Sequence, residues 1–242
     1  MLLAPLLDLA ERDSTTEQRS ADSTSNSFGG VVPFPPGGTP RVAAPVASST
    51  AKRCFDVLVS ATAIAILAPV LLLIAAAIWA ETRGPVFFRQ QRTGLLGRPF
   101  PILKFRTMTV QEDGGAVRQA CRGDTRITRV GAVLRKLSLD ELPQLINVLS
   151  GEMSLVGPRP HAVAHDQQFM RLVPNYADRF RARPGITGLA QVHGLRGEIV
   201  RESALILRAA ADIRYIETWS LAADIGILAR TALVVFRDPA AF

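Results

Sequence analysis

The amino-acid sequence predicts a mixed, helix-rich α/β fold in a monotopic membrane protein, one that enters the bilayer and returns on the same side. The first observation behind this prediction is a run of 24 residues without a charge, residues 57–80, which is apolar throughout. The second is the chain after residue 84, where short strand-like segments are mixed with amphipathic helical patterns. A third, the polar composition of residues 1–50, separates these residues from the folded part.

Composition narrows the class of protein. With 242 residues, 48% of them hydrophobic and 20% charged, the chain is too apolar to be disordered as a whole. The net charge is +7, and 25 of the 28 basic residues are arginines. Because arginine binds phosphate groups in a bidentate manner, phosphorylated ligands, nucleic acid or anionic lipid are expected as partners. The two cysteines, Cys54 and Cys121, form neither a disulfide framework nor a metal-binding pattern, which indicates a reducing compartment.

Residues 1–50 are predicted to be a disordered cytoplasmic tail. They are rich in Ser, Thr, Gly, Pro and Ala, and such a segment buries too little apolar surface to offset the entropy of ordering. No basic segment precedes a long apolar stretch at the start, so a signal peptide is not expected. Three arginines against five acids give the tail a net charge of −2, which leaves +9 on residues 51–242.

Residues 51–83 are predicted to form a re-entrant membrane hairpin. A straight helix over the apolar run would be about 36 Å long, enough to cross the hydrocarbon core of a bilayer. Pro69 lies in its middle and predicts a sharp kink, so that each arm of about 18 Å is too short to cross alone. A buried helix of a soluble protein is the alternative, but so long a helix without a polar face does not suit a domain of this size.

Basic residues flank the apolar run on both sides. Lys52 and Arg53 precede it, and Arg83, Arg89 and Arg92 follow it. Because positive charge marks the cytoplasmic side of a membrane segment, both ends are expected in the cytoplasm. The flanks therefore favour a hairpin over a true span.

Residues 84–242 are predicted to be a cytoplasmic catalytic domain. Short strands are expected at residues 86–88 and 101–105, around a glycine-rich turn at 94–97, and residues 183–192 look like a loop punctuated by proline and glycine. The last helical pattern carries only two charges, so it lies either at the membrane interface, as an amphipathic interfacial helix, or in the core. The helical patterns occupy residues 126–137, 142–149, 163–172, 203–216 and 221–236.

The pair Asp140-Glu141 is the first candidate for chemistry. Ser138 and Glu141 fit a capping box, in which both acids simply open a helix, but Pro143 would fall in its second turn and distort it. With Arg135 just upstream, the charged forms of the carboxylates are expected to be stabilised. Asp140 would then be suited to act as a nucleophile, and Glu141 to hold Mg²⁺ together with substrate phosphates.

Three further groups of residues were considered for binding. Arg159, in Gly157-Pro158-Arg159-Pro160, is either an ordinary solvated turn or a guanidinium held ready for a phosphate by its two prolines. Lys104 and Arg106 would share one face of a strand, although a basic strand face is more often plain surface. The third group, His161 and His165, has a spacing compatible with metal binding but no third ligand, so no metal site is predicted there.

The chain resembles the bacterial sugar transferases, the monotopic phosphoglycosyl transferases that begin exopolysaccharide and O-antigen synthesis. The resemblance covers residues 52–242 in the family's order. The stretches that carry it are KRCFDVLVS, the apolar run with Pro69, RQQRTGLLGRPFPILKFRTM, DTRITRVGAVLRKLSLDELPQLINVLSGEMSLVGPRP, RPGITGLAQVHGLRGE and YIETWSLAADIGIL.

This resemblance implies a reaction and a set of site residues. The family transfers a sugar-1-phosphate from a nucleotide diphosphosugar to undecaprenyl phosphate, and PHAVAH and GLAQVHGLRGE resemble members that transfer glucose-1-phosphate. By this mapping Asp140 forms a covalent aspartyl phosphosugar, which undecaprenyl phosphate then displaces, and Glu141 helps to bind Mg²⁺. The residues mapped to substrate binding are Lys104, Arg106, Arg135, Pro158, Arg159, Pro160, Gln191 and Arg196.

The resemblance also implies partners and a location. A UDP-sugar donor, undecaprenyl phosphate and membrane lipids are expected as partners, with UMP as a product and without nucleic acid, and a homodimer is left open. The expected location is the cytoplasmic face of the bacterial inner membrane. Ala68 stands where the family often has Ser before the helix-breaking Pro69, which leaves the hairpin angle open. Two alternatives remain: transfer of galactose-1-phosphate, and a non-enzymatic basic protein that binds membrane surfaces.

Overall fold

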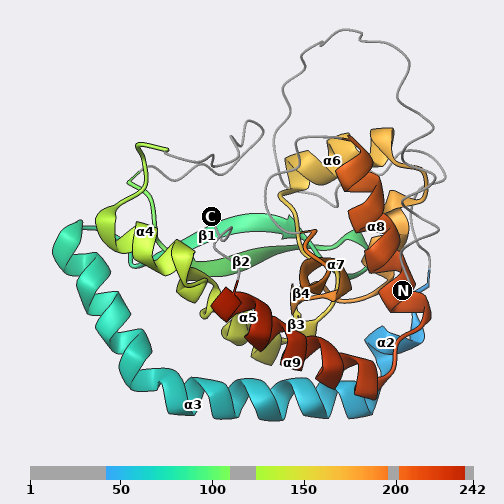
Figure 1. Ribbon diagram of the computed structural model, residues 1–242, viewed down its shortest axis with the longest axis horizontal. Helices are drawn as coiled ribbons and strands as arrows, with labels where there is room; N and C mark the ends of the chain where they lie inside the picture. The colour runs from blue at the N-terminus through green and yellow to red at the C-terminus, as the bar shows by residue number, and fades with distance from the viewer. Residues whose placement is uncertain (1–41, 110–123, 196–201, 238–242) are drawn as a thin grey trace, which may run out of the picture.

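The computed structural model describes residues 42–109, 124–195 and 202–237, and the side chains of the last segment as far as residue 233. Within these ranges the predicted mixed, helix-rich class is confirmed (Figure 1). The helices are α2 (Pro45–Ser48), α3 (Thr50–Glu81), α4 (Arg129–Lys136), α5 (Gln144–Ser150), α6 (Val163–Leu172), α7 (Leu189–Val192), α8 (Glu202–Glu217) and α9 (Leu221–Arg237). The strands are β1 (Phe87–Thr93), β2 (Pro99–Phe105), β3 (Ser154–Val156) and β4 (Gly185–Thr187), and the 3₁₀ turns are η1 (Leu95–Gly97), η2 (Leu139–Glu141) and η3 (Tyr176–Arg181).

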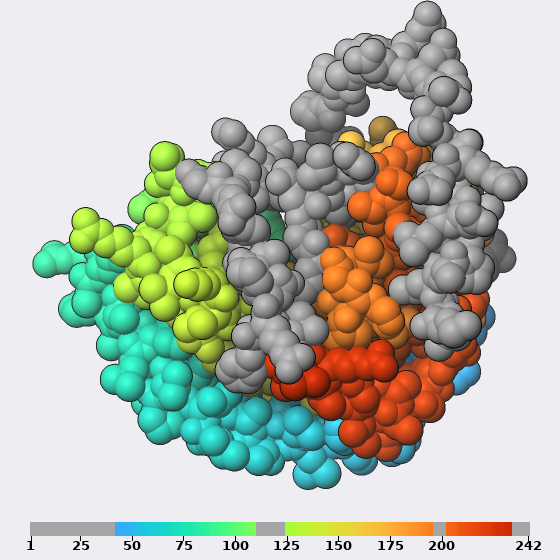
Figure 2. Space-filling model, viewed as in Figure 1, coloured from blue at the N-terminus to red at the C-terminus, as the bar shows by residue number. Residues whose placement is uncertain are grey.

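The apolar run forms the middle of one long helix, α3. Its 32 residues reach a mean hydropathy of 2.7 over their most apolar 18-residue window, and only 11% of that window is buried, so its length and composition suit a membrane. The sequence predicts two helical arms separated by a sharp kink at Pro69. In the structure Pro69 lies inside α3 without ending it, so the two arms belong to one continuous helix. One missing backbone donor bends a helix whose other hydrogen bonds persist. The bend is visible in Figure 1, and α3 lines the lower and left rim of the molecule in Figure 2.

Both ends of α3 are fastened to the rest of the fold. Near its start, Lys52 Nζ lies 2.8 Å from Asp224 Oδ2 of α9. At its end, the carboxylate of Glu81 accepts hydrogen bonds from the backbone N–H groups of Arg129 (2.7 Å) and Val130 (3.0 Å), the first residues of α4. The two arms of α3 therefore dock on one folded unit.

Two small sheets support the remaining helices. Strands β1 and β2 form an antiparallel hairpin where the sequence predicts two short strands around a turn. Both strands are longer than expected, and they pair from Phe87 opposite Phe105 to Thr93 opposite Pro99. Strands β3 and β4 pair in parallel. Residues 183–192 are therefore not a plain loop, which corrects the prediction: β4 and α7 lie there. Their pairing partner is some 30 residues away, so no local pattern indicates the strand.

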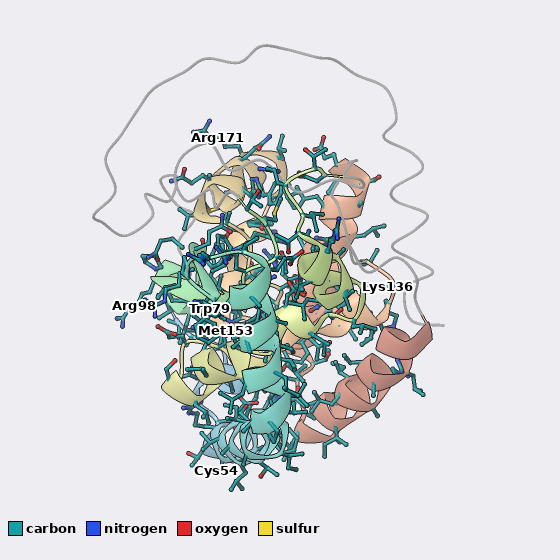
Figure 3. The ribbon with its side chains drawn as sticks, turned by 90° about the vertical axis from the view of Figure 1, so that its left-hand side faces the viewer. Cys54, Trp79, Arg98, Lys136, Met153 and Arg171 are labelled. Carbon is teal, nitrogen blue, oxygen red and sulfur yellow. The ribbon has the colours of Figure 1, made fainter. Side chains whose placement is uncertain are left out.

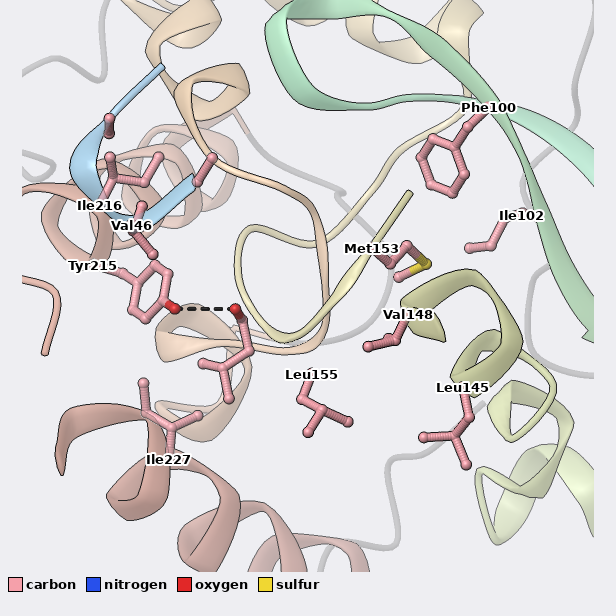
Figure 4. Close-up of a cluster of buried hydrophobic side chains, with 13 residues drawn as sticks. Val46, Phe100, Ile102, Leu145, Val148, Met153, Leu155, Tyr215, Ile216 and Ile227 are labelled. Carbon is pink, nitrogen blue, oxygen red and sulfur yellow. Dashed lines mark hydrogen bonds between the residues drawn. The ribbon is translucent and has the colours of Figure 1, made fainter. Parts of the chain in front are cut away.

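The main core joins these elements around β3. Figure 4 shows Met153 and Val148 between the hairpin residues Phe100 and Ile102 and the rest of the cluster. Ala44 and Val46, each less than 5% exposed, also belong to this core, so residues 42–50 are part of the fold and not of the predicted tail. The rest of that tail, residues 1–41, lies outside the described residues. The buried residues of the cluster are Ala44, Val46, Phe100, Ile102, Leu145, Val148, Met153, Leu155, Val156, Ala182, Tyr215, Ile216 and Ile227.

Candidate active site

Asp140 and Glu141 lie in η2, the 3₁₀ turn between α4 and α5. The capping box considered from the sequence is not formed, because Ser138 has φ 54° and ψ 22° and its side chain makes no capping hydrogen bond. This left-handed conformation is costly for a residue with a Cβ, and such strain is often found at functional sites. Helix α5 begins only after Pro143. The two acids are therefore displayed on a short turn rather than packed into a helix.

Glu141 is held between two cations. Lys104 Nζ lies 2.8 Å from Glu141 Oε1, and Arg159 donates from Nη2 to the same oxygen at 2.6 Å and from Nη1 to Oε2 at 3.3 Å. Asp140 is far less engaged: its Oδ2 lies 3.9 Å from Lys104 Nζ, and no hydrogen bond to its carboxylate is found among the described residues. We call these four residues, Lys104, Asp140, Glu141 and Arg159, the dyad cluster.

The surroundings shift the two carboxyl pKa values in opposite directions. Burial raises the pKa of Asp140, and the charge of Glu141 adds to this shift, although Lys104 and Arg135 oppose it. Burial acts in the same sense on Glu141, but the charges and hydrogen bonds of Arg159 and Lys104 hold the pKa of Glu141 well below its usual range. The expectation of a stabilised charged form is thus confirmed for Glu141 and wrong for Asp140. A more basic carboxylate with open oxygens is the better nucleophile of the two.

Arg159 is presented by a loop whose backbone is fixed from both sides. The N–H of Gly157 donates to a carbonyl of β4 at 2.9 Å, and the N–H of Gly185 donates to the carbonyl of Pro158 at 2.9 Å. Gly157 and Gly185 approach so closely that a Cβ on either would overlap the opposite backbone. Both flanking prolines, Pro158 and Pro160, are buried, whereas the Arg159 side chain is 32% exposed. The fixed backbone therefore directs the Arg159 guanidinium toward Glu141, and Arg159 is not an ordinary solvated turn residue.

The remaining substrate-binding candidates do not join the dyad cluster directly. Arg135 lies in the last turn of α4 and acts on Asp140 only through its charge. The guanidinium of Arg106 donates to the backbone carbonyl and the hydroxyl of Thr82, at the end of α3. Gln191 is buried, and its side-chain nitrogen donates to a backbone carbonyl at 3.1 Å. Arg196 lies outside the described residues.

A buried polar network, which no sequence pattern indicates, lies behind the Arg159 loop. Arg179 of η3 donates to the Arg159 carbonyl at 2.7 Å. Tyr176, Asp166 and Asp212 complete this network together with His161, whose Nδ1 lies 2.7 Å from the Tyr176 hydroxyl. These residues come from four separate segments, and no spacing or motif connects them, so only the fold brings them together.

The oxygen atoms of the dyad cluster suit Mg²⁺ in part. Oε1 of Glu141 accepts from two cations, but Oε2 accepts from one and keeps a second acceptor direction, and the carboxylate of Asp140 is open. In the described part of the chain, no cluster of three or more His, Cys, Asp or Glu residues is found. A magnesium ion here would therefore take its other ligands from substrate phosphates and water, as this cation usually does.

Comparison with known proteins assigns the family. A family model for bacterial sugar transferases matches residues 47–238, and the chain belongs to this family. It is 56% identical over 197 residues to the UDP-glucose:undecaprenyl-phosphate glucose-1-phosphate transferase of Caulobacter vibrioides, covering 81% of this chain and 72% of that protein. The resemblance drawn from the sequence motifs is thereby confirmed.

Two longer relatives show how far the similarity extends. The protein of the same name from Klebsiella pneumoniae is 46% identical over 191 residues, which cover 79% of this chain and 41% of that protein. The UDP-N-acetylgalactosamine-undecaprenyl-phosphate N-acetylgalactosaminephosphotransferase of Aeromonas hydrophila is 42% identical over 180 residues, covering 74% and 42%. The chain thus spans about two fifths of each of these two relatives.

Proposed function

We propose that this protein transfers glucose-1-phosphate from UDP-glucose to undecaprenyl phosphate and releases UMP, the first membrane step of exopolysaccharide synthesis. The observation that carries the proposal is the open, basic carboxylate of Asp140 beside two cations that are already placed for phosphate oxygens. The choice of glucose rests on the names of the Caulobacter and Klebsiella relatives, which are more similar to this chain than the Aeromonas protein is.

In the first step, a carboxylate oxygen of Asp140 attacks the phosphorus that carries the sugar. A bond forms between these atoms, the bond from that phosphorus to the bridging oxygen breaks, and UMP leaves with the electron pair. Lys104 and Arg159 both contact Oε1 of Glu141, so they lie close together and would stabilise negative charge on the phosphate oxygens. Glu141 keeps both cations in place before the substrate arrives.

In the second step, a phosphate oxygen of undecaprenyl phosphate attacks the same phosphorus, and Asp140 leaves as a free carboxylate. The sugar-bearing phosphate ends on the lipid, and the protein returns to its starting state. Because the chemistry is divided in this way, the soluble donor and the lipid acceptor need not be bound together. Mg²⁺ held by Glu141 would supply positive charge to the donor diphosphate.

We further propose that α3 enters the cytoplasmic face of the inner membrane and returns without crossing it. Both ends of α3 dock on one folded unit, through Lys52 and Glu81, so they cannot lie on opposite sides of a bilayer without dividing that unit. Cys54 on the first arm lies at the molecular edge opposite to Arg171 in Figure 3. The outward face of α3 exposes large apolar side chains at Leu58, Ile66, Leu72, Leu73 and Trp79. Burying such side chains in lipid is strongly favourable.

Helix α9 is a candidate interfacial helix beside α3. Ile225 and Leu233 are more than half exposed on it, whereas its Asp224 is fully buried against the fold. Its one other charge among the described side chains, Arg230, is exposed. A helix that buries its acid and exposes apolar side chains beside an arginine suits the boundary between headgroups and acyl chains. We therefore favour the interface over the core for this helix.

The reaction is tested with purified protein in lipid nanodiscs, Mg²⁺, undecaprenyl phosphate and a panel of UDP-glucose, UDP-galactose and UDP-N-acetylgalactosamine, with UMP release as the readout. We expect turnover with UDP-glucose, and no turnover when Asp140 is changed to Asn. No UMP from any donor would reject the enzyme and favour a non-enzymatic protein that binds membrane surfaces. For the covalent step we expect UMP release when undecaprenyl phosphate is left out, together with a phosphohexose adduct on Asp140 by mass spectrometry. UMP that appears only when undecaprenyl phosphate is present would reject this step.

The topology is tested by single-cysteine labelling in spheroplasts. Thr50→Cys and Pro85→Cys are placed in a chain without Cys54 and Cys121, because Cys54 is exposed and would react. We expect neither site to react with a membrane-impermeant maleimide before permeabilisation, and both to react afterwards. Reaction of only one of them in intact spheroplasts would contradict the re-entrant arrangement.

A further inference from the structure

The guanidinium of Arg179 joins η3 and α8 to the loop that carries Arg159. Its Nε donates to Asp212 Oδ2 of α8 at 2.8 Å, its Nη1 donates to the hydroxyl of Tyr176 at 2.6 Å, and its Nη2 donates to the Arg159 carbonyl at 2.7 Å. The Arg179 side chain is only 2% exposed, and that of Asp212 only 1%. Since it is planar and forked, such a group fixes direction as well as distance for each of its partners.

The partners of Arg179 are themselves held by further hydrogen bonds. Tyr176 donates its hydroxyl hydrogen to Asp166 Oδ1 at 2.6 Å, and His161 Nδ1 lies 2.7 Å from the same hydroxyl. Asp166 is fully buried, and Tyr176 is only 1% exposed. These shared hydrogen bonds restrict where Arg179 and Tyr176 can lie, because a shift of either would leave a buried partner without its hydrogen bond.

Burial of these charges is difficult to explain by stability alone. A buried ion network contributes little net stability compared with apolar side chains of the same size. The network converges on one backbone atom, the carbonyl of Arg159, between two buried prolines. Because the main chain is held there, only rotations about the side-chain bonds of Arg159 can move its guanidinium, which donates to Glu141 Oε1 at 2.6 Å.

We propose that Arg179 is a positioning residue for the transfer reaction: by holding the Arg159 carbonyl, it sets the place of the Arg159 guanidinium against Glu141 and the donor phosphate. Arg179 itself does not touch substrate and acts only through Arg159. This inference rests on the proposed function, and it gives the buried network behind the Arg159 loop a role in the transfer reaction.

The test is a double-mutant cycle between Arg179 and Arg159. Arg179→Lys keeps a positive charge but cannot serve three acceptors in fixed directions. We expect it to lower kcat for UMP release by about 100-fold, the size of effect that a displacement near 1 Å produces, with a smaller change in KM. In an Arg159→Ala background, the same substitution should change kcat by less than about 3-fold, because the group that it positions is gone.

Arg183→Lys is the matched control. Arg183 also donates to two backbone carbonyls, those of Gly151 and Ala47, but it makes no contact with the dyad cluster in the described chain. We expect it to change thermal stability without changing kcat by more than about 3-fold, and additively with Arg159→Ala. A second probe, Tyr176→Phe, keeps the ring and removes one acceptor of Arg179, so it reports on the network even if Arg179→Lys does not fold.

The outcomes separate this inference from the proposed function. Equal losses for Arg179→Lys and Tyr176→Phe in the wild-type and Arg159→Ala backgrounds would overturn the positioning role while the transferase reaction stands. Losses that match those of Arg183→Lys would overturn it as well. If the wild-type protein releases no UMP, the proposed function fails and this inference fails with it.

Discussion

Two clusters in this protein place a lysine against two carboxylates with nearly the same geometry. In the dyad cluster the lysine Nζ lies 2.8 Å from Glu141 and 3.9 Å from Asp140. In the second, which we call the anchor cluster, Lys52 Nζ lies 2.8 Å from Asp224 and 3.7 Å from Asp56. Since the distances agree so closely, they do not explain why one cluster is suited to chemistry and the other to holding α3.

The difference lies in how completely the carboxylates are satisfied. Asp224 also accepts from the Tyr215 hydroxyl at 2.8 Å and from the Trp219 ring nitrogen at 2.9 Å. Asp56 accepts from the Ser154 hydroxyl at 2.8 Å and from a backbone N–H at 3.2 Å. The side chains of the anchor trio are at most 5% exposed, whereas those of Lys104, Asp140 and Glu141 are 12% to 18% exposed.

This comparison separates a cluster whose carboxylates are fully hydrogen-bonded from one that, among the described residues, leaves a carboxylate without a hydrogen bond. In the anchor cluster every carboxylate oxygen has a donor, so the charges are fixed and closed to ligands. In the dyad cluster the hydrogen bonds of Lys104 and Arg159 go to Glu141, and no hydrogen bond to the Asp140 carboxylate is found in the described part of the chain. The predictions that follow can break or sharpen this distinction.

The largest expected effect comes from changing the open carboxylate. Asp140→Asn should lower UMP release by about 10⁴-fold or more, as loss of a catalytic nucleophile does, with little change in melting temperature. Asp56→Asn is the counterpart in the anchor cluster: it should lower the melting temperature and spare kcat of the folded fraction. Assays of UMP release and thermal unfolding on both variants measure these effects. A large loss of kcat in Asp56→Asn would contradict the assignment of activity to the dyad cluster and of stability to the anchor cluster.

Substitution of Lys52 should mainly lower stability, and substitution of Lys104 should mainly lower activity. Lys52→Met leaves two buried carboxylates without their cation and should lower the free energy of unfolding by about 3–5 kcal/mol. Lys104→Met leaves Glu141 paired with Arg159, so we expect a smaller loss of stability and a fall of about 100-fold in UMP release. Denaturant unfolding measures the first effect and the UMP assay the second. Equal losses of stability would show that the dyad cluster is structural too.

The buried His161 gives a test that depends on pH. Burial and the charge of Arg179 lower its pKa to about 3, below the usual 6.5, although Asp166 opposes this shift. Because the unfolded chain then binds a proton that the native state does not, stability is complete above pH 6.5 and is lost as the pH falls toward 3. Between pH 7 and 5 we expect a loss of about 2 kcal/mol in the free energy of unfolding. In His161→Gln this part of the pH dependence should be absent; an unchanged slope would contradict it.

The smallest expected effect concerns the strained turn before the dyad. Ser138→Gly removes the cost of a left-handed backbone and should raise the free energy of unfolding by about 1 kcal/mol or less. Leu96→Gly is the matched control, because Leu96 has nearly the same φ, 53°, in the β-hairpin turn. We expect similar stability changes for both, measured by thermal unfolding, but a lower rate of UMP release only for Ser138→Gly, whose freer turn holds Asp140 less firmly. Equal rates would show that the strain has no part in the reaction.

The sequence by itself determined the local features of this protein. The uncharged run predicts α3, because so long an apolar segment without a polar face is typical of a membrane helix. Helix α6 was predicted to the residue and α9 to within one residue, since periodicity acts over short distances. The two strands beside the glycine-rich turn were located but predicted too short. Asp140, Glu141 and Arg159 were predicted as candidate site residues from local motifs, and the structure places Glu141 and Arg159 in contact.

Tertiary structure alone decided how these features are used. The pairing of β3 with β4, the contact of Arg106 with Thr82 and the hold of Arg179 on the Arg159 loop join segments that are far apart in the chain. The opposite pKa shifts of Asp140 and its neighbour likewise depend on burial and on cations from other elements. Adjacent residues of the same chemical type have the same local propensities, so only the fold can give these two carboxylates opposite pKa shifts and different partners.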